Sequence, residues 1–330
     1  MKRREFISLL GGAAAWPLAA RAQQPMPVIG FLSTYSSSDA FAQYLLAAFH
    51  QGLKQAGYVE GQNVAVEYRW AGNEYERLTA LAAELVRRRV NVITTGSASL
   101  AVLAAKTATT TIPVVFLMGG DPVKLGLVAS LNRPGGNLTG ITTLNTEITP
   151  KRVEVLRELV PTTTIMAVLV NPTNNPANVE VELRQAQAAA NSLGLQTIHI
   201  LQASTEADLD GIFSTLMQQR AGGLVITADT LFSGKSAELA ALASRHAMPT
   251  ISPYREFVTA GGLMSYGGSV TELYRLVGVY TGRVLNGEKP ANLPVQQVTK
   301  VDLVINLRTA KALGLTVPPT LLARADEVIE

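Results

Sequence analysis

The sequence predicts an α/β protein made of two doubly wound parallel-sheet lobes joined by a three-segment hinge. Short β-branched runs alternate with longer helical patterns, which is typical of parallel sheets built through right-handed crossovers. This alternation begins at residue 28 and starts again near residue 151, so it indicates two wound units. The chain of 330 residues is also long enough for two domains of ordinary size, each with its own core.

Residues 1–22 have the pattern of a secretory signal peptide. The charged start Lys2-Arg3-Arg4 precedes an apolar stretch over residues 6–20, and residues 20–22 form a small-x-small cleavage pattern. The apolar stretch is short for a membrane-spanning helix. The pair Arg3-Arg4 also resembles a twin-arginine signal, although Lys2 stands where such signals usually carry Ser or Thr. We therefore expect a periplasmic protein, exported by the twin-arginine or the general route.

The first lobe is expected to comprise residues 27–143 and 262–290. Buried or alternating β-branched runs predict its strands, and apolar residues at helical spacing predict its helices. The expected strands are 28–33, 63–68, 90–95 and 112–117, and the expected helices are 40–55, 75–89 and 98–108.

The second lobe is expected to comprise residues 144–261 and 291–330. The same patterns recur there, and Gly194 marks the end of its longest helix. The expected strands are 165–170, 197–201, 224–227 and 250–251, and the expected helices are 151–160, 179–193, 209–219 and 236–245.

The tail of the chain supplies too few elements for a third domain. A strand over 262–266 and a helix over 270–285 are followed by a strand over 298–305 and an Ala/Leu-rich helix. These pieces are better used to complete the two lobes, one part for each. The chain would then cross between the lobes three times, and three crossing segments make a hinge.

The composition excludes several classes of protein. The sequence has no Cys, so disulfide scaffolds, Cys-ligated zinc and iron–sulfur clusters are excluded. The leader accounts for the whole formal charge of +3, and the rest of the chain is neutral, so no nucleic-acid partner is expected. The three His residues are isolated and lack metal-ligand spacing, and no cofactor is expected.

Candidate ligand-binding residues follow the expected strands. Ligands of parallel α/β sheets bind beyond the carboxyl ends of the strands, and helices that begin there offer free N–H groups. The stretches after these strands are polar or small and open helices. The candidate residues are Ser33, Tyr35, Gly96, Ser97, Ala98, Gly120, Asp121, Asn174, Asp229, Tyr254 and Tyr266.

These residues suit a ligand that has both charged and apolar parts. Ser97 and Ser99 add hydroxyl donors, Asp229 is the natural partner of an ammonium group, and the tyrosines offer flat apolar walls. Each polar residue also has an ordinary structural interpretation, because the same types are common helix N-caps. Tyr254 and Tyr266 are likewise common as core or turn residues.

No enzyme signature is present, so we expect no catalytic activity. The sequence has no nucleophile elbow, no phosphate-binding loop and no dinucleotide-binding glycine motif after the first strand. Two alternatives stay open. One is a ligand-sensing periplasmic protein that serves a membrane receptor. The other is a periplasmic enzyme, for which only Asp121 and Asp229 are acid–base candidates.

Several stretches carry a resemblance to a known family. They are residues 51–53, 57–63, 121–123, 131–140, 256–258, 260–267, 303–307 and 310–315, of which Arg-Pro-Gly-Gly-Asn at 133–137 is the most specific. Together they resemble the ABC-transporter substrate-binding family that includes tryptophan/tyrosine-type binding proteins. The resemblance implies a type I periplasmic binding fold with a small-molecule ligand, such as an amino acid or aromatic acid, between the two lobes. We expect a monomer that captures this ligand by lobe closure.

The resemblance also implies partners and site roles. The partners would be an ABC permease and an ATPase at the inner membrane, which together import the ligand. In related amino-acid binders of this fold, the loop matching residues 96–99 holds the ligand carboxylate. An acid of the second lobe holds the ammonium group, and Asp229 fits that role by strand order.

Overall fold

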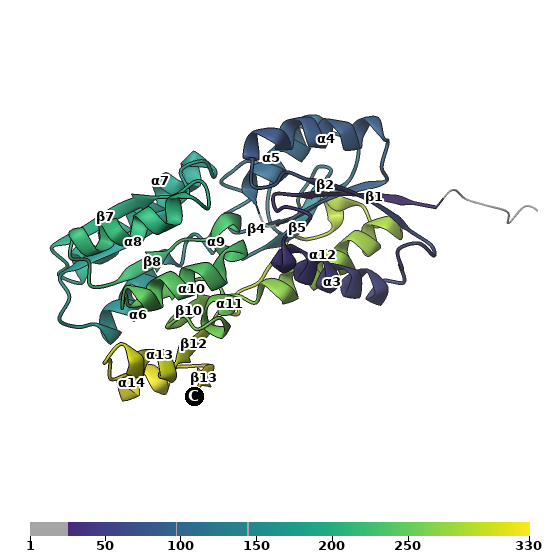
Figure 1. Cartoon of the computed structure of the whole chain (residues 1–330). Helices are drawn as coiled ribbons and strands as arrows, with labels where there is room; N and C mark the ends of the chain where they lie inside the picture. The colour runs from purple at the N-terminus through teal and green to yellow at the C-terminus, as the bar shows by residue number, and fades with distance from the viewer. Residues whose placement is uncertain (1–25, 97, 144) are drawn as a thin grey trace, which may run out of the picture.

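The structure is a computed structural model that describes residues 26–96, 98–143 and 145–330. It confirms the expected α/β fold with two lobes, which Figure 1 shows side by side. The expected signal peptide and Ser97 lie outside the described residues. Within the described part of the chain, no helix has the length and apolar character needed to cross a bilayer.

The first lobe contains a six-stranded sheet in which every neighbouring pair is parallel. Its strand order is β11-β5-β4-β3-β1-β2. The bounds are β1 Val28–Ser33, β2 Ala65–Trp70, β3 Val92–Thr95, β4 Val114–Met118, β5 Leu138–Thr142 and β11 Gln296–Gln297.

Helices cover both faces of this sheet because its central strands are apolar on both sides. In β1, Phe31 packs into the core under α3 (Ala40–Gln55) and α12 (Val270–Leu285). The next residue, Leu32, packs into the opposite core. That core lies under α4 (Leu78–Arg87), which follows the 3₁₀ turn η1 (Tyr75–Arg77), and under α5 (Ser99–Ala108).

The second lobe contains a seven-stranded sheet of order β13-β12-β10-β9-β8-β6-β7. Only the pair β10–β12 is antiparallel. The bounds are β6 Ile165–Val170, β7 Thr197–Gln202, β8 Leu224–Ile226, β9 Thr250–Ser252, β10 Met264–Gly267, β12 Asp302–Asn306 and β13 Glu327–Ile329.

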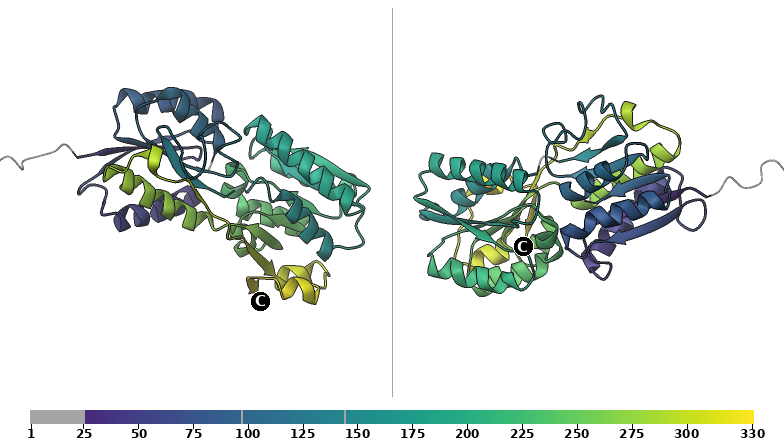
Figure 2. Two further views of the ribbon diagram at one scale, coloured as in Figure 1. Left: turned by 180° about the vertical axis from the view of Figure 1, so that it is seen from behind. Right: turned by 90° about the horizontal axis from the view of Figure 1, so that it is seen from above.

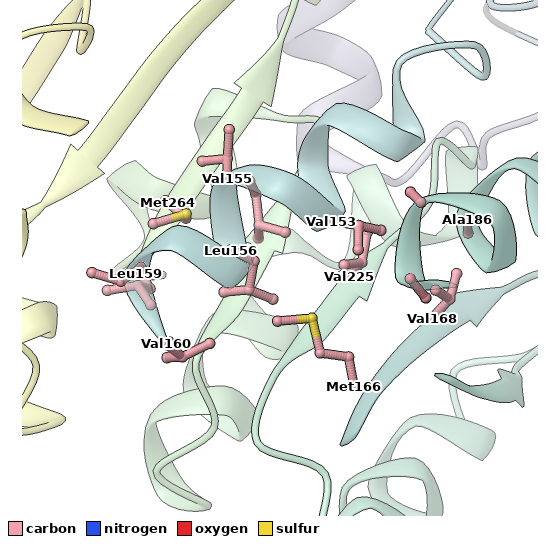
Figure 3. Close-up of a cluster of buried hydrophobic side chains, with 14 of the residues drawn as sticks. Val153, Val155, Leu156, Leu159, Val160, Met166, Val168, Ala186, Val225 and Met264 are labelled. Carbon is pink, nitrogen blue, oxygen red and sulfur yellow. The ribbon is translucent and has the colours of Figure 1, made fainter. Parts of the chain in front are cut away.

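Two cores sandwich the second sheet. Side chains of α6 such as Val153 and Leu156 lie against Met166 and Val225 of the strands, as Figure 3 shows. Alternate strand residues pack into the other core, under α8 and α10. The helix bounds are α6 Thr149–Leu159, α7 Pro176–Ser192, α8 Asp208–Gln218, α9 Thr230–Gly234, α10 Ser236–Arg245, α11 Arg255–Thr259, α13 Leu307–Ala312 and α14 Pro319–Leu322.

Three segments connect the lobes, as the sequence predicts, and the further views in Figure 2 show them passing between the two bodies. They lie between β5 and α6, between β10 and α12, and between β11 and β12. The expected lobe boundaries need two corrections.

Residues 264–267 were expected in the first lobe, but as β10 they extend the second sheet beside β9. Residues 291–297 were expected in the second lobe. They contain the last two residues of η2 (Pro290–Asn292) and all of β11, which pairs with β5 of the first sheet. The physical reason is strand pairing. Each tail strand pairs with an unpaired edge of one sheet, and the hydrophobic pattern of the sequence does not reveal which of the two sheets that is.

Helices α3 and α12 come from opposite ends of the chain and lie against each other with their backbones in close contact. A Cβ atom on Gly278 would lie 2.1 Å from the carbonyl oxygen of Phe49, and one on Gly52 would lie 1.8 Å from that of Arg275. Both are backbone atoms, which cannot move aside as a flexible side chain can. Glycine at both positions therefore permits this helix pair.

Replacing Gly278 by alanine is expected to lower the free energy of unfolding by about 1–3 kcal/mol, because the added methyl group forces α12 away from α3. A matched control is Gly211 in α8, where an added Cβ meets no atom within 4 Å. Gly211→Ala should raise stability by about 0.5–1 kcal/mol through helix propensity. Urea unfolding followed by circular dichroism measures both, and equal effects of the two substitutions would contradict the close packing.

Candidate functional site

A cavity lies between the lobes, where the carboxyl ends of strands from both sheets meet. The space among its lining residues is about 730 Å³, including the part open to solvent. Six of the candidate ligand-binding residues named above line it. They are Tyr35, Ala98, Gly120, Asn174, Asp229 and Tyr254.

The first lobe contributes the start of α5. Ala98 is the N-cap residue of this helix, and its own side chain makes no capping hydrogen bond. Ala98 and Ser99 both line the cavity. The N-terminal N–H groups of a helix carry a partial positive charge, so this end of the cavity suits an anionic group.

The second lobe contributes Asp229, the N-cap residue of α9. Oδ1 accepts hydrogen bonds from Asn171 Nδ2 at 3.1 Å and from the backbone N–H of Leu231 at 2.9 Å. Oδ2 accepts from Asn174 Nδ2 at 2.8 Å and from the hydroxyl of Tyr75, in the first lobe, at 2.9 Å. Burial raises the pKa of Asp229, while these four donors act to lower it. Asp229 therefore joins the two lobes as well as capping a helix.

Two further contacts join the lobes at the cavity. The hydroxyl of Tyr35 lies 2.8 Å from Oγ of Ser233 in α9. On the other side, Asn178 Nδ2 in α7 donates to Ser99 Oγ at 3.1 Å. The phenol of Tyr35 is deeply buried, and this burial raises its pKa well above the ordinary value. The lobes thus touch around the cavity through specific polar contacts.

A buried polar network forms the floor of the cavity on the side of the second lobe. Glu182 of α7 lines the cavity with only 3% of its surface exposed, and Thr149 donates a hydrogen bond to its Oε1. Burial raises the pKa of Glu182 to about 7. Thr149 Oγ1 in turn accepts from Arg152 Nη1 at 3.1 Å. A threonine hydroxyl thus links this acid to a buried arginine.

Arg152 of α6 is fully buried, and its guanidinium group donates hydrogen bonds where two of the crossing segments begin. Its Nε donates to the carbonyl oxygen of Tyr266, at the end of β10, at 2.9 Å. Its Nη1 donates to the carbonyl oxygen of Asn145 at 3.2 Å, and its Nη2 donates to the side-chain oxygen of the same residue. Burial lowers the pKa of Arg152 to about 10, so it stays protonated at neutral pH.

Four residues expected in the site do not line the cavity. Ser33 Oγ accepts the backbone N–H of Tyr35, and Gly96 leaves room for the Tyr274 hydroxyl, which would lie 2.8 Å from a Cβ there. Asp121 accepts the backbone N–H groups of Val123 and Lys124 in the turn that follows it, as its structural interpretation predicts. The side chain of Tyr266 packs against the core of the second lobe instead.

Sequence reasoning also missed much of the cavity wall. Glu182 had a readable signal, since it lies on the same helix face as the buried Ala186 and Ala190. Asn145 and Thr146 come from a crossing segment without a distinctive pattern. The residues missed are Leu117, Met118, Gly119, Thr143, Asn145, Thr146, Asn178, Val179, Glu182, Ala228, Thr230, Val270 and Leu273.

The cavity wall combines polar groups with apolar surface. Tyr35, Leu117 and Leu273 belong to the first lobe, and Val179 and Tyr254 belong to the second. Across residues 26–96, 98–143 and 145–330, no group of three or more His, Cys, Asp and Glu side chains is placed to hold a metal ion. The arrangement suits reversible binding of a small molecule that has charged and apolar parts.

Known proteins share this architecture. A family model described as ABC transporter substrate binding protein matches residues 36–329. The tyrosine-binding protein of Clostridioides difficile (strain R20291) is 26% identical over 270 residues, which cover 81% of this chain and 75% of that protein.

Two solved structures superpose on most of the chain. A conserved domain protein from Vibrio cholerae O1 biovar El Tor has 25% sequence identity and a TM-score of 0.81. An ABC domain from Streptococcus pneumoniae, in complex with L-Trp, has 23% identity and a TM-score of 0.80. Each comparison covers 92% of this chain and 100% of the other chain.

Proposed function

Because the chain belongs to the family of ABC transporter substrate-binding proteins, we propose that it captures an α-amino acid for an importer. The observation that carries this proposal is the composition of the interlobe cavity. The start of α5, where the N-cap residue Ala98 has no capping side chain, faces it from the first lobe, and two carboxylates, Asp229 and Glu182, face it from the second. An α-amino acid carries one negative and one positive group, which match these two walls.

The apolar part of the wall supports an aromatic or large aliphatic side chain on the ligand. Tyr35 and Tyr254 offer ring surfaces, and Leu117 and Leu273 add aliphatic surface. The relative from Clostridioides difficile is named for tyrosine, and the structure from Streptococcus pneumoniae holds L-Trp. We therefore take L-tyrosine and L-tryptophan as the first ligands to test.

Ligand binding would favour the arrangement in which the lobes touch. A ligand that contacts both walls gains its full set of interactions only when the lobes are together, so it shifts the population toward that state. The contacts Tyr75–Asp229, Tyr35–Ser233 and Ser99–Asn178 support the same state. The role proposed for the protein is thus reversible capture by lobe closure.

The wider setting follows from the family and the leader. We infer that residues 1–22 direct export to the periplasm and that the mature protein acts there as a monomer. Its partners would be a permease and an ATPase of the inner membrane, which accept the ligand-bound form. Isolation of the mature protein from a periplasmic fraction, cleaved near residue 22, would test the export step.

A thermal-shift screen of the L-amino acids on the mature protein tests the proposed ligand class. A ligand present at about 100 times its Kd stabilises the folded state by about 2.7 kcal/mol, which should raise the melting temperature by about 5 °C. We expect this shift with L-tyrosine or L-tryptophan. Solution scattering of the same samples should show a smaller radius of gyration when the ligand is bound.

The screen includes glucose and benzoate as neutral and purely anionic controls. A shift with either of these and none with any amino acid would overturn the proposed ligand class. An unchanged radius of gyration with a bound amino acid would contradict lobe closure while leaving the ligand class intact.

A further inference from the structure

Glu182 is the carboxylate in the cavity that still has room for a hydrogen-bond donor. We propose that Glu182 binds the ammonium group of the ligand and that Asp229 instead positions the cavity wall. This inference rests on the proposed function, since it assumes an amine-bearing ligand in the interlobe cavity. It replaces the role that strand order alone assigns to Asp229.

Asp229 has no unused acceptor capacity in this arrangement. A carboxylate offers about four lone-pair positions. Donors from Asn171, Asn174, Tyr75 and the backbone of Leu231 lie at hydrogen-bond distance from them. An ammonium group could bind Asp229 only by displacing one of these donors. A displaced amide or backbone N–H would then lack its acceptor, and only the Tyr75 hydroxyl would keep a partner, Thr230 Oγ1 at 3.0 Å.

Glu182 presents the opposite situation. Within the described residues, the only donor to its carboxylate is Thr149, which bonds Oε1. Oε2 has no such donor. It is not one of the fully buried polar atoms that lack a partner, so it keeps some accessible surface. The residue as a whole is nevertheless 97% buried, and it lines the cavity. A buried carboxylate with an open oxygen facing a cavity is suited to a cationic partner.

The surroundings of Glu182 leave its charge only partly compensated. Arg152 of α6 acts on it electrostatically and through Thr149, but no ion pair within 4.0 Å joins the two described side chains. Asp229, before α9, repels the ionised form. Tyr254, before α11, also faces this acid, and Glu182 in turn opposes ionisation of that phenol. An arriving ammonium group would supply the missing charge.

The spacing along α7 matches the two ends of an α-amino acid. Asn178 bonds Ser99 at the start of α5, where the ligand carboxylate is proposed to bind. Glu182 follows Asn178 by one helical turn on the same face, so the two side chains lie about 5–6 Å apart at their Cβ atoms. A carboxylate near Ser99 and an ammonium near Glu182 can therefore belong to one ligand.

Proton release is a consequence of this pairing. The pKa of Glu182 is raised to about 7, so at pH 6 most of the unliganded protein carries a proton on this acid. An ammonium group favours the ionised form, so binding at pH 6 must release that proton. At pH 8 Glu182 is already ionised, and little release is expected.

Calorimetric titration of the mature protein tests the pairing with three probes. L-Tyrosine has both charged groups, tyramine lacks the carboxylate, and 3-(4-hydroxyphenyl)propionate lacks the amine. For the two amines, affinity should fall about tenfold from pH 8 to pH 6, with release of nearly one proton at pH 6. The charges of the amine and carboxylate of these probes hardly change between pH 6 and pH 8. The propionate should show no such dependence.

Glu182→Gln keeps the size of the side chain and an acceptor for Thr149 but removes the charge. It should weaken binding of L-tyrosine and tyramine by about 30-fold or more and abolish the proton release. The matched control is Glu180→Gln, an exposed position on the same helix, which should bind as the unaltered protein does.

The outcomes separate this inference from the proposed function. Unaltered amine affinity and proton release in Glu182→Gln would overturn the role of Glu182 and leave the function standing. Tyramine binding with pH dependence, but no binding of any amino acid, would overturn the ligand class and support Glu182. If the variant does not fold, absence of proton release by the unaltered protein at pH 6 would still refute the pairing.

Discussion

Arg152→Met is expected to lower the free energy of unfolding by about 3–5 kcal/mol. The methionine would fill much of the same space but donate no hydrogen bond. The carbonyl oxygens of Tyr266 and Asn145 would then be buried without donors, and Glu182 would lose the cation that acts on it. Urea unfolding followed by circular dichroism, at a fixed pH near 7, measures the change.

The control for this substitution is Arg184→Met. Arg184 is an exposed arginine in α7 whose ion pair with Glu180 lies at the surface. Its replacement should change the unfolding free energy by less than about 0.5 kcal/mol. If both substitutions have the same small effect, the buried arginine does not stabilise the crossing segments.

Asp229→Ala is expected to weaken ligand binding by about 100-fold and to lower the free energy of unfolding by about 2–4 kcal/mol. The helix α9 loses its N-cap, which accounts for about 1 kcal/mol. The amides of Asn171 and Asn174 lose a buried acceptor, and so does the hydroxyl of Tyr75. Titration calorimetry and urea unfolding measure the two effects on the same preparation.

Tyr75→Phe separates the interlobe contact from the effects within the second lobe. It removes one donor to Asp229 and leaves the other three in place, among them the Leu231 N–H that forms the α9 cap. Ligand affinity should fall about tenfold. The hydrogen bond from Tyr75 to the charged Asp229 forms only when the lobes are together, so its loss destabilises that state alone. The radius of gyration without ligand should rise. An unchanged affinity would show that Tyr75 does not stabilise the joined lobes.

Local patterning identified most elements of the fold. The helices α3, α10 and α12 and the strands β1 and β6 begin and end where the residue patterns predict. The elements that were missed are short. They include β5, whose five residues follow the glycine turn at 135–136, and the one-turn helices α9 and α11. Such segments contain too few residues to show a helical or strand periodicity.

The candidate site was predicted less completely than the fold. Asp229 and Tyr254 were located from the strand ends, because ligands of parallel α/β sheets generally bind beyond the carboxyl ends of the strands. The same rule could not separate lining residues from capping residues, so it also selected Asp121. Glu182 and Asn145 reach the cavity from a helix face and a crossing segment, and only the three-dimensional packing brings them there.

The contact between α3 and α12 has a consequence for biosynthesis. The ribosome completes α12 only after five of the seven strands of the second sheet have been made. Until then Phe31 of β1 and Phe49 of α3, which share a core with residues of α12, are only partly covered. Neither lobe is one uninterrupted length of polypeptide, so neither can reach its final form before translation approaches the carboxyl terminus.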